Sequence, residues 1–106
     1  MKQMRQGDVY ITKVRSIPKA AQEKKRDGGR VVLAYGEVTG HAHAIVEETA
    51  TLFSLLDDGK EELYLEADGT VVLRHEEHSP ITIDKGLYKV TRQREYSPEE
   101  IRNVAD

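Results

Sequence analysis

Residues 51–75 read TLFSLLDDGKEELYLEADGTVVLRH, and their pattern decides the fold. Three runs rich in apolar residues are separated by short runs rich in Asp and Gly, which is typical of a β-meander. Asp68-Gly69 predicts a two-residue hairpin, because the favoured turn needs positive φ angles. The predicted strands are 51–56, 62–67 and 70–75, with turns at 57–60 and 68–69.

The same pattern extends to both sides of this meander. Lys19 to Gly29 is polar and charged, so we expect 15–29 to be a mobile basic loop. Ser97 and Glu100 predict the start of a helix at 98–104, with Ser97 as its cap. About eight short strands and one short C-terminal helix predict an all-β fold, either a small β-barrel or a β-sandwich. The remaining strands are predicted at 9–14, 30–35, 41–47, 81–83 and 87–95.

Length and composition predict one soluble domain spanning residues 1–106. The chain has no cysteine, so a bound metal would need histidine, carboxylate or water ligands. Its apolar stretches are far too short for a membrane span. Met1 to Arg5 does not resemble the start of a signal peptide. We therefore expect a cytoplasmic protein without a membrane contact.

Charge is unevenly distributed along the chain. Residues 1–30 hold nine Lys and Arg against three Asp and Glu, whereas residues 31–106 hold seven against sixteen. The basic part could contact a nucleic-acid backbone. Only one aromatic residue, Tyr10, lies in it, which argues against a base-stacking surface. A solvated loop is therefore the favoured interpretation, and nucleic-acid binding is the least favoured function.

All four histidines fall in two short clusters. In the first cluster, His41 and His43 are two apart on a predicted strand, so both imidazoles point to the same face and can reach one ion. Glu47 shares that face but lies some 13 Å further along an ideal strand, so it reaches the same ion only if the strand bends or bulges. The second cluster holds His75 and His78, which cannot both point inward from one straight strand.

Histidines and a carboxylate form an ordinary ligand set for a divalent transition metal such as Zn, Fe, Mn or Ni. The sequence therefore predicts a metal site, with either His75 or His78 joining the first cluster. Two other interpretations stay open: the histidines line a metal-free polar pocket, or they form no site. The predicted metal ligands are His41, His43, His78, His75 and Glu47.

The run Gly40-His41-Ala42-His43-x-x-x-Glu47 resembles the first metal-binding motif of cupins. The resemblance implies that a bulged strand supplies His41, His43 and Glu47, and that a histidine from a later strand is the fourth ligand. The second cupin motif places Pro-x-Gly before its histidine, whereas here Pro80 follows His78. The overall order of motifs is also similar to that of small uncharacterised bacterial proteins, which implies no activity.

Two classes of function follow from these residues. The first is a metal-binding β-barrel protein, either a binding domain or an enzyme in which Glu37, Glu76 or Glu77 acts as a general base beside a metal-bound water. The second is a non-enzymatic interaction or accessory module, favoured by the small size and the uneven charge. The ligand or partner, a small molecule or a protein, stays open, as does a homodimer.

Overall fold

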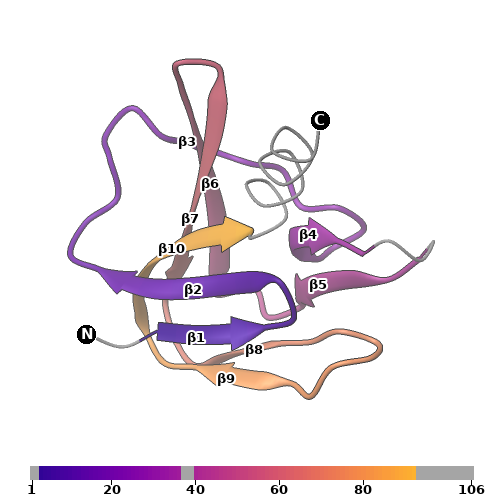
Figure 1. The fold of residues 1–106 in the computed structure, drawn as a ribbon. Coiled ribbons are helices and arrows are strands. Elements are labelled where there is room, and N and C mark those ends of the chain that lie inside the picture. Colours follow the sequence, from indigo (N-terminus) through magenta and orange to yellow (C-terminus); the bar gives the residue numbers. More distant parts are fainter. Residues whose placement is uncertain (1–2, 37–39, 93–106) are drawn as a thin grey trace, which may run out of the picture.

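The computed structural model describes residues 3–36 and 40–92, and these residues form an all-β fold (Figure 1). The all-β class predicted from the sequence is thereby confirmed. Two short strands, β1 and β3, were not predicted from the sequence. The strands of the described residues are β1 (Gln3–Gln6), β2 (Val9–Val14), β3 (Gln22–Glu23), β4 (Val31–Tyr35), β5 (Ala42–Ile45), β6 (Ala50–Asp57), β7 (Lys60–Ala67), β8 (Val71–Leu73), β9 (Ile81–Ile83) and β10 (Gly86–Arg92).

No helix occurs within residues 3–36 and 40–92. The predicted helix at 98–104 and the last residues of the predicted strand at 87–95 lie outside the described residues. In the described part of the chain, nothing helical is long and apolar enough to cross a membrane.

The larger sheet has six antiparallel strands in the order β1-β2-β10-β7-β6-β3. Its longest hairpin joins β6 to β7 through Asp58 and Gly59, with Asp57 paired to Lys60. Both turn residues have positive φ, 55° for Asp58 and 80° for Gly59. Two successive positive φ angles are what a type I′ hairpin turn requires, so the predicted turn at 57–60 is confirmed.

The second Asp-Gly dipeptide behaves differently, and the hairpin predicted at Asp68-Gly69 is wrong. β7 pairs with β6 and β10, whereas β8 pairs with β9 in a separate sheet. The Asp68 amide donates to the carbonyl of Thr49 instead of closing a turn. Gly69 has a φ of 155°, far from the angle of a type I′ turn. The chain therefore crosses here from one sheet to the other.

Two smaller sheets, β4 with β5 and β8 with β9, appear beside and below the larger sheet in Figure 1. An antiparallel bridge between Ala44 and Arg74 joins the two pairs, since each amide donates to the other residue's carbonyl. The register of β4 against β5 shifts between Val32 and Ala34, which marks a β-bulge. The described strand pairings do not close into a barrel.

One core cluster contains side chains from all three sheets. Buried residues alternate with partly exposed ones along β8 and the first four residues of β2, as expected for strands with one buried face, whereas Leu63, Tyr64 and Leu65 of β7 are all buried. The largest fully buried side chains are Ile11, Leu33, Ile45, Leu65, Leu73, Ile83, Val9 and Val71.

Two features in the first third of the chain help to determine where the site lies. Gly7-Asp8 is a two-residue turn between β1 and β2, with Gln6 paired to Val9 and a Gly7 φ of 60°. The segment 15–29, predicted to be a mobile loop, contains β3, and the Arg26 guanidinium donates to the carbonyls of Val46, Glu47 and Ala50. One positive charge of the basic region is therefore used to hold this segment against the end of β5.

Candidate metal centre

The bridge between Ala44 and Arg74 explains how two distant histidine clusters meet. Extending the same antiparallel register by one residue places His43 opposite His75, and two residues further it places His41 opposite Glu77. The ladder ends here, because β5 begins at Ala42 and β8 ends at Leu73. All four histidines therefore gather where β5 begins and β8 ends, with His78 beside His75.

His75 is the central ring of this group. Its ring centroid lies 4.3 Å from that of His43, 4.8 Å from that of His78 and 5.7 Å from that of His41. The rings of His43 and His78 are 5.9 Å apart and nearly parallel. The two clusters therefore form one contiguous histidine group.

His43 is the buried member, with only 3% of its surface exposed. Its Nδ1 lies 2.8 Å from Oε1 of Gln6, and its Nε2 lies 3.7 Å from Oδ1 of Asp8. The side-chain amide of Gln6 donates to the carbonyl oxygens of Leu73 and Ser79, each at 2.9 Å. Gln6 therefore ties the β1–β2 hairpin to both ends of the segment that carries His75 and His78.

These bonds fix the proton on His43. Both donors of the Gln6 amide group point to carbonyl oxygens, so its Oε1 is the atom that faces His43. An oxygen of this kind only accepts, which means that Nδ1 of His43 carries the hydrogen and donates it. His43 and Gln6, which is 2% exposed, thus form a buried, fully bonded link.

Gly7 gives the histidines the space they occupy. A Cβ added at Gly7 would lie 2.8 Å from Nε2 of His78 and 3.3 Å from Cε1 of His43. The backbone of the β1–β2 turn therefore packs directly against two imidazoles, at a residue whose φ of 60° already favours glycine.

An outer group of candidate metal ligands consists of His41, His75 and Glu76, whose ligand atoms all lie within 4.8 Å of one another. Glu76 is held in place by the Ala42 amide, which donates to its Oε1 at 3.0 Å. That backbone hydrogen bond lowers the pKa of the Glu76 carboxyl, with smaller help from its own amide and from His41 and His75. The carboxylate therefore stays ionised, as a metal ligand must be.

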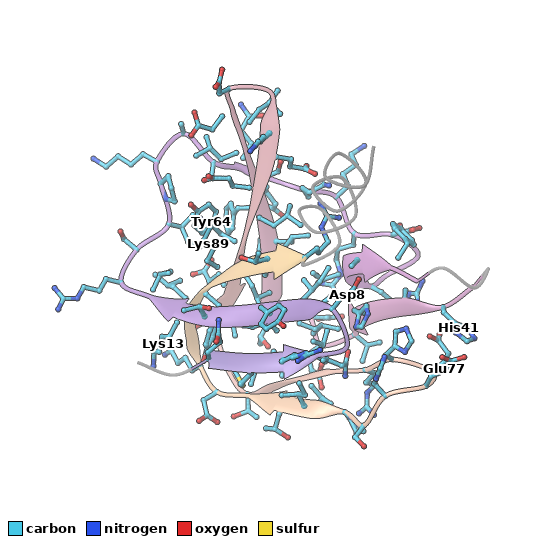
Figure 2. The ribbon with its side chains drawn as sticks, in the orientation of Figure 1. Asp8, Lys13, His41, Tyr64, Glu77 and Lys89 are labelled. Carbon is cyan, nitrogen blue, oxygen red and sulfur yellow. The ribbon has the colours of Figure 1, made fainter. Side chains whose placement is uncertain are left out.

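His41 has a carboxylate neighbour of its own. Its Nδ1 lies 3.6 Å from Oε2 of Glu77, and Figure 2 shows the two side chains next to each other at the surface. A metal-bound histidine commonly has a carboxylate or carbonyl near its second ring nitrogen, which orients the ring. Glu77 occupies that position relative to His41.

His75 makes one hydrogen bond that bears on its use as a ligand. The Glu77 amide donates to its Nδ1 at 3.0 Å, so a neutral His75 carries its hydrogen on Nε2. A metal ion at Nδ1 would need the lone pair that accepts this hydrogen bond. A metal ion at Nε2 would displace the hydrogen from that nitrogen, so the neutral ring would carry its hydrogen on Nδ1. Metal binding through either nitrogen therefore breaks this exposed hydrogen bond.

The predicted ligands are thus divided by the fold. His41 and His75 come together with Glu76, while His43 and His78 pack against His75 but are not part of that group of ligand atoms. Glu47 is not part of this group, and its Oε1 accepts a hydrogen bond from the Val72 amide at 3.3 Å.

Glu76 was predicted from the sequence only as a general base, and Gln6 and Gly7 were not predicted to belong to the site. Glu76 follows His75 directly, and pairing the strand of His43 with that of His75 would have placed it beside Ala42. Gln6 and Gly7 belong to a hairpin far away in sequence, and no local pattern connects them to the histidines.

Comparison with known proteins gives one result. No curated protein and no solved structure matches the chain. A family model described as Domain of unknown function (DUF8820) matches residues 5–93, a range that includes every residue of the histidine group. The chain belongs to this family.

Proposed function

We propose that this protein binds one divalent transition metal ion through His41, His75 and Glu76. Two imidazoles and one carboxylate suit Zn²⁺, Fe²⁺, Mn²⁺ or Ni²⁺. A set of three protein ligands leaves a further coordination position for water or a bound ligand. The scaffold we propose is a β-sandwich, which is supported by the core cluster that the larger sheet shares with the two smaller ones.

The observation that carries this proposal is the convergence of three ligand atoms within 4.8 Å. Around a tetrahedral ion at about 2.1 Å from each ligand, these atoms would be roughly 3.4 Å apart. The side chains must therefore close by little more than an ångström. Glu76 is exposed and His41 is half-buried, so these side chains have room for this movement.

A cupin-like site would use a different carboxylate. The cupin resemblance implies Glu47 as a ligand, but the Glu47 carboxylate accepts from the Val72 amide, whereas Glu76 lies with the histidines. We therefore propose Glu76 in place of Glu47, with His43 and His78 as packing partners of His75.

The test is metal analysis of protein purified without a histidine tag and then supplied with Zn²⁺, Mn²⁺, Fe²⁺ or Ni²⁺ in turn. We expect close to one ion per chain for the preferred metal. In NMR spectra, the Glu77 amide should lose its protection from exchange, because its hydrogen bond to His75 is broken. A metal content below about one-tenth per chain after supplementation would overturn the proposal.

Variants separate this site from non-specific binding. Glu76→Gln keeps the acceptor for the Ala42 amide but removes the charge, so metal affinity should fall by about 100-fold or more. Glu48→Gln makes the same change on an exposed carboxylate away from the histidines and should leave affinity unchanged. Equal affinities in these two variants would contradict the assignment of Glu76.

A further inference from the structure

A pocket of about 390 Å³ adjoins the proposed metal ligands on the face of the β4–β5 pair that points away from the core. Its volume falls in the range of small-molecule sites. His75 and Glu76 line both this pocket and the outer metal-binding group. The pocket and the metal centre are therefore neighbours that share two residues.

Small side chains form the floor of the pocket. Ala42 and Ala44 are 3% and 5% exposed, and they alternate along β5 with His43, which points to the core side. Val46 and Pro80 add apolar surface at its edges. The floor therefore offers close approach to the β5 backbone without polar side chains of its own.

Two arginines supply the charge. Arg74 pairs directly with Ala44, so their side chains lie on the same face of the ladder. Arg30 precedes β4 and exchanges two backbone hydrogen bonds with Asp27. Both backbones are thus fixed, and both guanidinium groups line the pocket. Within residues 3–36 and 40–92, neither guanidinium has a carboxylate partner at ion-pair distance.

We propose that this pocket binds a small anion, a carboxylate or a phosphate, through Arg30 and Arg74. Guanidinium groups bind both kinds of anion through paired N–H donors. The apolar floor and the volume fit a metabolite-sized molecule rather than a macromolecule. Two positive charges face one negative charge, that of Glu76, in the pocket.

The position of this anion deepens the proposed function. If His75 and Glu76 hold a metal, they would bring it to the edge of the same pocket that Arg30 and Arg74 line. This last point rests on the proposed metal site, whereas anion binding by the arginines does not. The two proposals therefore need separate tests.

The test uses metal-free, ¹⁵N-labelled protein at low ionic strength, titrated with inorganic phosphate and, separately, with succinate. We expect saturable shifts of the backbone amides of 42–46 and 74–76, with a dissociation constant on the order of 1 mM or tighter for at least one probe. Binding of phosphate alone or of succinate alone supports the proposal and identifies the preferred anion.

Arg74→Gln and Arg30→Gln should each weaken binding of that probe about tenfold. Arg15→Gln removes the same charge from an exposed residue outside the pocket and should leave binding unchanged. Zinc binding should persist in Arg74→Gln, so failure of one proposal does not mimic failure of the other. The proposal is overturned if neither probe gives saturable shifts, if the shifts lie elsewhere, or if Arg15→Gln weakens binding as much as the pocket variants.

Discussion

His43 and His41 are two residues apart, yet the fold gives them opposite environments. His43 is 3% exposed, and its Nδ1 hydrogen is held by Gln6. His41 lies before the first residue of β5, with 23% of its side chain exposed, and its nearest charged partner is the exposed Glu77. The inner histidine is hydrogen-bonded within the core, whereas the outer one lies half-buried beside an exposed carboxylate.

This difference separates stability from binding within one histidine group. A buried polar network contributes to stability only while every member has its partner. A half-buried pair of imidazoles beside an exposed carboxylate contributes less to folding and can exchange water for an ion. We therefore expect changes at Gln6 and His43 to affect unfolding first, and changes at His41, His75 and Glu76 to affect metal binding first.

The largest expected effect is that of Gln6→Ala. This change leaves the carbonyls of Leu73 and Ser79 and the His43 Nδ1 hydrogen without their partner. Unpaired buried polar groups are costly, so the free energy of unfolding should fall by about 3 kcal/mol, measured by urea denaturation. Gln3→Ala, on the exposed side of the same strand, is the matched control and should cost less than about 0.5 kcal/mol. Equal losses in the two variants would remove the distinction between the inner and outer histidines.

Metal binding should stabilise the protein through the outer group. At a free Zn²⁺ concentration 100 times the dissociation constant, the free energy of unfolding should rise by about 2.7 kcal/mol, and a chelator should reverse the gain. The gain should vanish in His75→Ala. Mg²⁺ is the control ion, because it prefers oxygen ligands and should give no such gain. A zinc effect that survives His75→Ala would move the metal away from this group.

Most of the strands follow from local patterns, and the exceptions have physical reasons. Alternation and turn residues located β6, β7 and the turn between them, since Asp58-Gly59 adopts the angles that its sequence favours. The identical dipeptide at Asp68-Gly69 makes no hairpin, because the neighbours of β7 are already β6 and β10. Local sequence predicts that a turn is possible, but the sheet decides whether the two strands pair.

The sequence predicted that histidines of the two clusters come together, whereas the different environments of His41 and His43 could not be predicted. On an ideal strand, residues two apart share a face, but His41 lies just before β5 and His43 lies inside it. The register that places Glu76 beside Ala42 is set by the bridge at Ala44 and Arg74, between segments that are thirty residues apart in the sequence. Gln6 contributes from a hairpin still further away, so its role depends wholly on tertiary contacts.

Gly7→Ala should lower the free energy of unfolding by less than Gln6→Ala does, because its added methyl group would press on His43 and His78. Gly7 and Gly28 have nearly equal φ angles, 60° and 63°, but an added Cβ meets nothing within 4 Å at Gly28 and meets His78 at 2.8 Å at Gly7. Both variants carry the strain of a positive φ, so their difference isolates the contact with the histidines. We expect Gly7→Ala to lose about 1–2 kcal/mol more than Gly28→Ala in the same denaturation assay. Equal losses would show that the turn does not press on the imidazoles.

The smallest effect on stability should come from Glu77→Gln. This variant tests which carboxylate near His41 binds the metal. Glu77 is 63% exposed, so the loss of its ion pair with His41 should change the free energy of unfolding by less than about 0.5 kcal/mol. If Glu77 only orients the His41 ring, zinc affinity should fall by about tenfold or less, well short of the loss in Glu76→Gln. Isothermal titration of both variants with Zn²⁺ makes the comparison. An equal or larger loss in Glu77→Gln would make Glu77 the ligand, because a carboxylate that only orients a histidine contributes less than one bound to the metal.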